Sequence, residues 1–212
     1  MKQCVIMFDF DGVIADSFDV FYPALVQTLR EGGYSCIRNP AEFRALFDTN
    51  FCQGLEASGV RRAEASAILA EVGRKVQCRL GAMRLFPGVS EAIHALAAAC
   101  PLYVITSNQG SLVEAYLEQV GLRACFRAVL GADTHPSKTE KIRQVRSLHP
   151  RQSFVYVGDT AGDMCEARQA RVRSAAVLWG WHDSERLRAQ SPDFLCAAPS
   201  DLLQLRLPAC KP

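Results

Sequence analysis

The chain has 212 residues, of which 49% are hydrophobic and 22% are charged. This composition supplies an apolar core and excludes a disordered chain. The net charge of +2 provides no basic surface for a polyanion, so we expect neither nucleic acid nor a membrane as a partner. The length favours one large domain, or a core domain of about 150 residues that carries an insertion.

The cysteine pattern is the next constraint on function. The chain has nine cysteines, but no two of them form a Cys-x-x-Cys pair, so the spacing typical of a zinc site is missing. Scattered thiols are typical of a reducing compartment. The apolar run near residue 4 is too short for a signal peptide or a membrane span. We therefore expect a cytoplasmic protein.

Short apolar runs alternate with helical patterns along most of the chain. We expect strands at residues 4–8, 102–105, 128–130, 154–157 and 175–178, with a weaker one at 193–195. Helices are expected at residues 89–99, 111–120, 139–148, 162–170 and 200–205. Repeated strand–helix units predict an α/β fold, with a Rossmann-like parallel sheet covered by helices.

One long stretch interrupts this alternation. From about residue 18 to residue 80 the apolar residues follow a helical period, as in Phe21, Leu25 and Leu29. This pattern predicts a small all-helical insertion after the first strand. Because ligands usually bind at the strand ends beside it, we expect the insertion to act as a cap. The predicted organisation is a core domain made of residues 1–16 and 83–212, and a cap domain made of residues 17–82.

Two acidic pairs follow predicted strands. Asp9 and Asp11 come at the end of the first strand and precede Gly12, which permits a sharp turn. Asp159 and Asp163 follow the strand at 154–157 in the same way. Like charges gathered at strand ends are costly unless a cation intervenes. Four carboxylates suit a hard cation with oxygen ligands, so we predict a Mg²⁺ site formed by Asp9, Asp11, Asp159 and Asp163.

Two further strand ends offer groups that bind anions. Thr106, Ser107 and Asn108 supply hydroxyl, amide and backbone donors at a turn before a helix. Lys138 lies at the predicted start of another helix, where a cation is unfavourable unless an anion is near. Lys141, one helical turn later, is the competing lysine.

Together these groups could hold a phosphoryl group and attack it. A carboxylate nucleophile can form an aspartyl-phosphate. A divalent cation and a lysine offset the charge on the phosphoryl oxygens. A second carboxyl group can protonate the leaving alkoxide and then deprotonate the attacking water.

The order of these segments resembles the four motifs of the haloacid dehalogenase (HAD) superfamily. The segments are Asp9-Phe-Asp11-Gly12-Val13, Thr106-Ser107-Asn108, Lys138 and Gly158-Asp159-Thr-Ala-Gly-Asp163. The helical insertion falls where that family has its small helical cap. The length, with the tract 177–182, resembles the phosphoglycolate phosphatase-like subgroup.

The resemblance implies a role for each motif residue. Asp9 would be the nucleophile and a metal ligand, and Asp11 the general acid and base that also lends its backbone carbonyl to Mg²⁺. Thr106, helped by Ser107 and Asn108, would bind the phosphoryl group, while Lys138 would neutralise it. Asp159 would bind the metal directly, and Asp163 would lie in the outer coordination shell. These roles together describe a Mg²⁺-dependent phosphatase of a small phosphorylated metabolite.

Several alternatives stay open at this stage. A β-phosphoglucomutase-like phosphotransferase has the same core, and a pyrophosphatase or a dehalogenase belongs to the same superfamily, although Asp11 argues against a dehalogenase. A receiver-like signalling module also uses a phosphorylated aspartate. The substrate is not readable, but Arg44 or Arg61 could meet a substrate carboxylate and residues 50–54 could form a specificity loop. A monomer and a homodimer are both compatible with the sequence.

Overall fold

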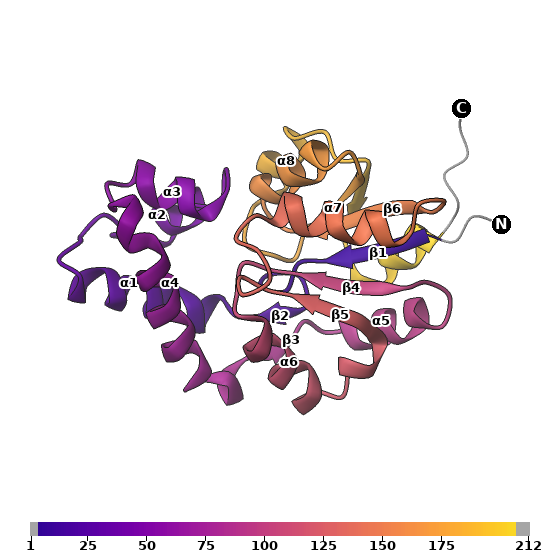
Figure 1. Ribbon diagram of the computed structural model, residues 1–212, viewed down its shortest axis with the longest axis horizontal. Coiled ribbons are helices and arrows are strands. Elements are labelled where there is room, and N and C mark those ends of the chain that lie inside the picture. Colours follow the sequence, from indigo (N-terminus) through magenta and orange to yellow (C-terminus); the bar gives the residue numbers. More distant parts are fainter. Residues whose placement is uncertain (1–3, 207–212) are drawn as a thin grey trace.

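A six-stranded parallel sheet forms the centre of the computed structural model, which describes residues 4–206. The strand order is β5-β4-β1-β6-β7-β8, and every neighbouring pair is parallel. The first strand lies in the middle, so its carboxyl end opens onto the central crevice of the sheet (Figure 1). The strands are β1 (Cys4–Phe8), β4 (Leu102–Ile105), β5 (Phe126–Leu130), β6 (Ser153–Gly158), β7 (Arg173–Val177) and β8 (Phe194–Cys196).

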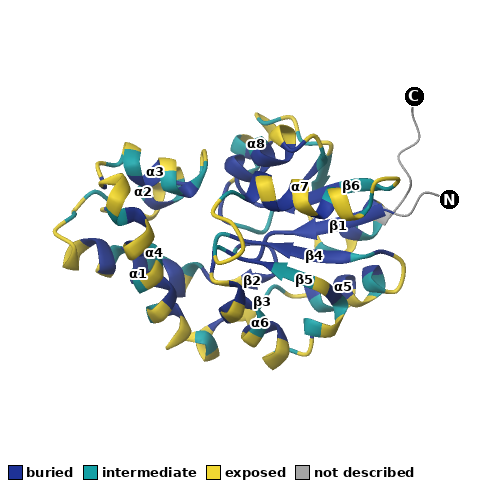
Figure 2. Cartoon of the chain, in the orientation of Figure 1, coloured by how far each residue is buried: buried dark blue, intermediate teal, exposed yellow. Residues whose placement is uncertain are grey.

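Helices cover both faces of this sheet. One face packs against α5 (Val89–Ala97) and α6 (Gly110–Gln119), and the other against α7 (Lys138–Leu148) and α8 (Ala161–Gln169). All five residues of β1 are therefore buried, which explains their uninterrupted apolar run. Figure 2 shows β1 and β4 in dark blue and exposed residues on the outer faces of the helices. The predicted α/β fold is confirmed.

The helical insertion stands beyond the carboxyl ends of the strands (Figure 1). It contains α1 (Phe18–Glu31), α2 (Pro40–Ala45), α3 (Phe51–Ala57) and α4 (Arg62–Gln77), and we call residues 18–77 the helical block. Helices α1 and α4 pack against each other, and the predicted apolar positions Leu25 and Leu29 are buried between them and their neighbours.

A short antiparallel ribbon marks where the chain leaves and rejoins the sheet-bearing part. It pairs β2 (Ala15–Asp16) with β3 (Arg84–Leu85). Two-residue strands carry no readable periodicity, so the sequence did not predict this ribbon. Between the ribbon and the sheet, Phe86 donates its backbone N–H to the carbonyl of Ile14 at 3.3 Å.

The C-terminal elements differ in detail from the sequence expectation. The weak strand is present as β8, but the helix expected at residues 200–205 is the 3₁₀ helix η3 (Pro199–Arg206). A short helix, α9 (Ser184–Arg188), was not foreseen. Two further 3₁₀ turns, η1 (Leu80–Ala82) and η2 (Arg123–Cys125), connect larger elements. Within residues 4–206 no helix has the length and apolar character needed to cross a bilayer.

Candidate active site

Asp9 is the first residue after β1, and it is only 6% exposed. Its backbone N–H donates to the carbonyl of Val157 in the neighbouring strand at 2.8 Å, so the sheet fixes its position. Its Oδ1 accepts the N–H of Phe10 at 2.8 Å, and its Oδ2 accepts a hydrogen bond from Lys138 Nζ at 2.6 Å. One carboxylate oxygen is thus paired with the lysine predicted to neutralise the phosphoryl group.

Asp11 is held by two side chains from different parts of the chain. Its Oδ1 accepts from Ser17 Oγ at 2.6 Å, and its Oδ2 accepts from Asn108 Nδ2 at 3.3 Å. Gly12 follows with a φ of +75°, and a Cβ there would lie 2.0 Å from Asp159 Oδ2. Glycine is therefore needed both for the turn and for the close approach of the two acidic segments.

The second acidic pair lies at the end of β6 and the start of α8. Asp159 is fully buried, and its Oδ2 accepts the backbone N–H of Trp181 at 2.8 Å. Asp163 forms a reciprocal capping box with Thr160, which fixes its side chain at the helix start. Its Oδ1 also accepts from Lys138 Nζ at 2.8 Å and from the Tyr156 hydroxyl at 3.1 Å.

Three of these carboxylates could hold a metal ion together. One oxygen from each of Asp9, Asp159 and Asp163 lies within 4.8 Å of the other two, and all three residues are buried. Asp159 Oδ1 is buried and has no hydrogen-bond partner among the described residues, which is costly unless a cation binds it. The donor set consists of hard oxygens, which fits Mg²⁺. The Asp11 side chain lies outside this trio, so its contribution through a backbone carbonyl stays a prediction.

Burial sets the electrostatics of the cluster. Desolvation raises the pKa of Asp9 to about 8 even though Lys138 opposes the shift, and it raises the pKa of Asp159 well above its ordinary value. Burial also acts to raise the pKa of Asp163, but the Lys138 ammonium and the bonds from Thr160 and Tyr156 hold it below its usual range. In the metal-free protein the carboxyl groups therefore cannot all ionise easily, and a bound cation would favour their ionised forms.

The two candidate lysines have different contacts. Lys138 is the first residue of α7, and its ammonium lies between Asp9 and Asp163. These anions raise the pKa of Lys138 despite its burial. Lys141 instead donates to the backbone carbonyls of Thr106 and Gly131, at 2.5 and 3.0 Å. Lys138 is thus the lysine in contact with the acidic cluster, while Lys141 ties together the ends of β4 and β5.

The predicted phosphoryl-binding segment follows β4. Thr106 is buried, and its Oγ1 accepts the backbone N–H of Asn108 at 3.0 Å. Ser107 is half-buried and faces the same cavity as the acidic residues. Asn108 also holds Asp11 through its Nδ2, a positioning contact that the sequence did not indicate.

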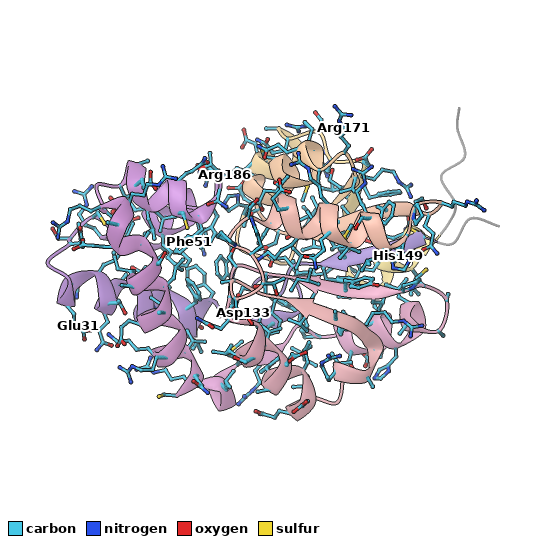
Figure 3. The ribbon with its side chains drawn as sticks, in the orientation of Figure 1. Glu31, Phe51, Asp133, His149, Arg171 and Arg186 are labelled. Atoms are coloured by element: carbon cyan, nitrogen blue, oxygen red, sulfur yellow. The ribbon has the colours of Figure 1, made fainter. Side chains whose placement is uncertain are left out.

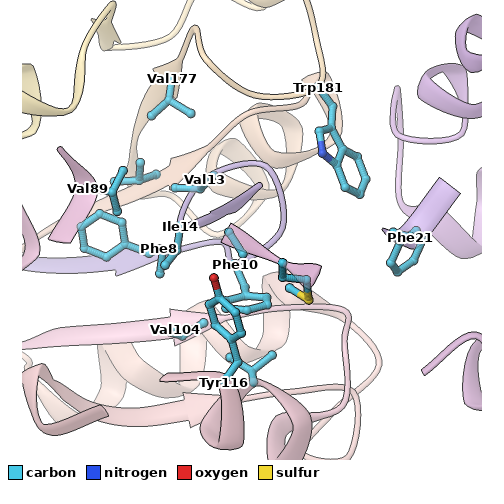
Figure 4. Packing of buried hydrophobic residues seen from close by; sticks show 14 of the residues in the cluster. Phe8, Phe10, Val13, Ile14, Phe21, Val89, Val104, Tyr116, Val177 and Trp181 are labelled. Atoms are coloured by element: carbon cyan, nitrogen blue, oxygen red, sulfur yellow. The ribbon is translucent and has the colours of Figure 1, made fainter. Parts of the chain in front are cut away.

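All the predicted site residues line one cavity of about 40 Å³. The structure therefore brings together Asp9, Asp11, Thr106, Ser107, Asn108, Lys138, Asp159 and Asp163. The opposite wall comes mainly from the helical block, with Phe51 on the side that faces the sheet (Figure 3). Figure 4 shows Trp181 extending from the sheet-bearing part toward Phe21, whose ring centroid lies 5.7 Å away.

Trp181 and Glu166 are among the cavity residues that were not foreseen as site residues. Trp181 belongs to the tract after β7, which the sequence marked only as a subgroup feature. Glu166 lies one helical turn after Asp163 on α8, a spacing that places both on one face. It accepts a hydrogen bond from Asn50 Nδ2 of the helical block at 3.2 Å. Burial raises the pKa of Glu166 to about 7.

Known proteins resemble this chain in sequence and in fold over most of its length. The chain is 32% identical over 204 residues to a phosphoglycolate phosphatase from Synechococcus elongatus, covering 94% of this chain and 95% of that protein. It is 28% identical over 217 residues to a phosphoglycolate phosphatase from Aquifex aeolicus, with 95% of each chain covered. Among solved structures, a haloacid dehalogenase-like hydrolase from Streptococcus pneumoniae matches with a TM-score of 0.79 and 23% identity, covering 94% of this chain and 96% of that one.

The family model described as haloacid dehalogenase-like hydrolase matches residues 6–177, which include every predicted site residue from Asp9 to Asp163. This range also spans the helical block and five of the six strands of the parallel sheet, from within β1 to the end of β7. The chain belongs to the haloacid dehalogenase-like hydrolase family, and within it is a phosphoric monoester hydrolase similar to the phosphoglycolate phosphatases.

Proposed function

We propose that this protein is a Mg²⁺-dependent phosphatase that hydrolyses a small phosphorylated metabolite through a phosphorylated Asp9. The observation that carries the proposal is the buried cluster in which Lys138 contacts Asp9 and Asp163 while Asp159 lies beside them. A nucleophile, a cation site and a fixed ammonium are the groups that phosphoryl transfer requires.

The residues suited to hold Mg²⁺ are Asp9, Asp159 and Asp163, with the backbone carbonyl of Asp11 as the further ligand implied by the family. The bound ion would supply positive charge to the phosphoryl oxygens. Lys138 adds a second positive charge from within the protein. Thr106, Ser107 and Asn108, which line the same cavity, would orient the phosphoryl oxygens.

The chain's own residues divide the reaction into two displacements. An Asp9 oxygen attacks phosphorus, the ester P–O bond breaks, and the leaving oxygen takes a proton from Asp11. Water then attacks the phosphorus of phospho-Asp9 and gives its proton to Asp11, which releases inorganic phosphate and restores the Asp9 carboxylate. Burial raises the pKa of Asp11, which favours the protonated form needed in the first displacement.

We also propose that residues 17–82 act as a cap domain over a core of residues 1–16 and 83–212. The backbone N–H of Gly162 donates to the carbonyl of Phe47 at 2.9 Å, and His182 Nε2 lies 2.9 Å from the carbonyl of Arg44. A cavity of about 40 Å³ has room for only a few water molecules, at roughly 10–15 Å³ each. Because this volume is smaller than a phosphomonoester, we propose that the helical block shifts outward when substrate binds and closes over it, which would exclude water from the reaction.

We also propose that the protein is cytoplasmic. The cysteines that the structure describes are all free, which supports the cytoplasmic location expected from the sequence.

The test is a panel of phosphomonoesters assayed for release of inorganic phosphate. We expect turnover of several substrates with Mg²⁺ and loss of turnover after chelation. Absence of phosphate release from the whole panel, or release that chelation leaves unchanged, would contradict the proposal. A β-phosphoglucomutase-like enzyme is distinguished by the products, because it would transfer the phosphoryl group to a second sugar position instead of to water.

A further inference from the structure

The wall of the cavity that faces the phosphoryl site is largely aromatic. Phe21, Phe47 and Phe51 line it from the helical block, and Trp181 lines it from the other side. The rings of Phe47 and Phe51 are stacked with their centroids 4.9 Å apart, and Phe47 also meets Trp181 edge-on at 4.9 Å. Leu69 of α4 completes this apolar wall.

The same cavity is rich in carboxyl groups and poor in cationic side chains. Within the described part of the chain, the lining residues carry one ammonium and five carboxyl groups, those of Asp9, Asp11, Asp159, Asp163 and Glu166. The ammonium belongs to Lys138 and is already paired with two carboxylates. Apart from the proposed Mg²⁺ site, which serves the phosphoryl group, nothing in this wall offers a positive charge to the leaving group.

The arginines considered from the sequence do not fill this gap. The Arg44 guanidinium stacks over the ring of Phe18, 4.5 Å from its centroid, and Arg61 pairs with Glu64. Among the described residues that line the cavity, neither Arg44 nor Arg61 is present. Arg62 lines an adjoining groove, but it pairs with Glu56 at 3.6 Å and its side chain is 89% exposed.

The neutral polar side chains of this wall do not favour the binding of a substrate carboxylate. Thr49 and Asn50 both line the cavity, and the Asn50 amide already donates to Glu166. Glu166 is only 7% exposed, so a substrate carboxylate placed beside it would be a buried negative charge next to another carboxyl group. Burying a charge without a partner is strongly unfavourable, whereas an apolar or aromatic group gains from contact with these rings.

We propose that the leaving group of the natural substrate is uncharged and apolar, with a planar face that packs against Phe47, Phe51 and Trp181. The substrate class is thus a phosphomonoester of a hydrophobic alcohol, not a phosphorylated hydroxy acid. This inference rests on the proposed phosphatase function and specifies the substrate for the same site. Phosphoglycolate, on which the similar curated enzymes act by name, would be a poor substrate of this chain.

Three esters of primary alcohols test the proposal with similar intrinsic reactivity. They are benzyl phosphate, 2-phosphoglycolate and 2-phosphoglycolamide, in which a neutral amide replaces the carboxylate at nearly the same size. We expect kcat/KM for benzyl phosphate to exceed that for phosphoglycolate at least tenfold, with the amide also preferred to the carboxylate. Equal or higher kcat/KM for phosphoglycolate would overturn the inference.

Variants of the wall separate charge from shape. Leu69 is half-buried on α4 and lines the cavity. Leu69→Arg should raise the kcat/KM of phosphoglycolate relative to benzyl phosphate at least tenfold over Leu69→Gln, and an unchanged ratio would contradict the inference. Arg62→Ala should leave the ratio as in the wild type, because Arg62 is not part of the wall. A selective loss of phosphoglycolate turnover in Arg62→Ala would instead show that Arg62 binds the substrate carboxylate, and it would overturn the inference.

The outcomes for the two proposals are distinguishable. If none of the three esters nor any other phosphomonoester releases phosphate with Mg²⁺, the phosphatase function fails and the inference fails with it. If phosphoglycolate is the preferred ester, the phosphatase function stands and only the substrate class is wrong.

Discussion

Lys138 connects the two acidic strand ends, since its ammonium contacts Asp9 at 2.6 Å and Asp163 at 2.8 Å. Lys138→Met would leave both carboxylates buried without their cation. We expect the free energy of unfolding of the metal-free protein to fall by about 3–5 kcal/mol. The kcat for phosphate release should fall more than about a hundredfold, because the ammonium that offsets the negative charge of the phosphoryl oxygens is lost.

Chemical denaturation and steady-state kinetics check both expectations. Arg38→Met is a matched control, since Arg38 forms an exposed pair with Glu42 far along the sequence from the site motifs. This variant should change neither quantity appreciably. Wild-type stability or turnover in Lys138→Met would show that the lysine does not hold the acidic cluster together.

Glu166 should make stability depend on pH. Burial raises its pKa from 4.5 to about 7, so between these values the folded protein binds a proton that the unfolded chain has released. Stability therefore falls as pH rises through this window. Glu166→Gln keeps an acceptor for Asn50 but cannot ionise, so its Tm in metal-free buffer should exceed that of the wild type at pH 8, with the difference narrowing toward pH 5.

Thermal melts across pH 5–8 provide the measurement. Glu185→Gln, an exposed carboxyl on α9, serves as the control for loss of one negative charge. A constant Tm difference between Glu166→Gln and the wild type over the whole range would contradict the assignment of the raised pKa.

At the scale of elements, the start of α8 joins the acidic cluster to the helical block. Gly162 donates its N–H to the carbonyl of Phe47, and a Cβ at this position would lie 2.4 Å from the carbonyl oxygen of Thr49. Gly162→Ala should therefore displace this loop. We expect a loss of about 1–3 kcal/mol in unfolding free energy and at least about a tenfold fall in kcat/KM.

Gly81→Ala is the matched glycine control, because a Cβ at Gly81 meets nothing within 4 Å among the described residues. It should leave kcat/KM unchanged. If Gly162→Ala behaves like Gly81→Ala in both measurements, the contact between α8 and the Phe47 loop is not needed for the closed arrangement.

The sequence predicted best those elements whose residues are uninterrupted apolar runs. The bounds of β1 and β4 agree with the expectation residue for residue, because each is a fully buried apolar run ended by polar residues. The β2–β3 ribbon and α9 are too short to carry a period. The 3₁₀ form of η3 was also missed, since apolar spacing over a few residues does not separate it from an α-helix.

The candidate site shows the same division. Asp9, Asp11 and Asp159 could be found because acids directly after apolar strands are conspicuous, and parallel strand ends must meet at one edge of the sheet. Glu166 and Trp181 could not, because their place in the cavity depends on how the helical block packs onto α8 and onto the loop after β7. No local pattern in the sequence encodes that packing.

For the molecule as a whole, the helical block and the sheet-bearing part share an aromatic cluster. Phe43 of α2 is fully buried, and its ring lies 5.4 Å from that of Phe18 and 5.3 Å from that of Trp181. Phe43→Ala should reduce the free energy of unfolding by about 3–5 kcal/mol. Because the cluster joins both parts, we expect one cooperative transition in the wild type.

Denaturant unfolding followed by circular dichroism and by tryptophan fluorescence tests this prediction. Leu148→Ala is the control, since Leu148 is 63% exposed and its loss should have little effect. Separate transitions by the two probes in the wild type, or a small effect of Phe43→Ala, would show that the helical block unfolds independently.

The most direct test of the proposed mechanism is the pre-steady-state release of nitrophenolate from p-nitrophenyl phosphate in the Asp9 and Asp11 variants. This leaving group needs no proton, so Asp11→Asn should still form phospho-Asp9 but hydrolyse it slowly. We predict a burst of one equivalent of nitrophenolate per chain in Asp11→Asn, followed by slow turnover, and no burst in Asp9→Asn. A burst or wild-type turnover in Asp9→Asn would contradict a covalent intermediate on Asp9.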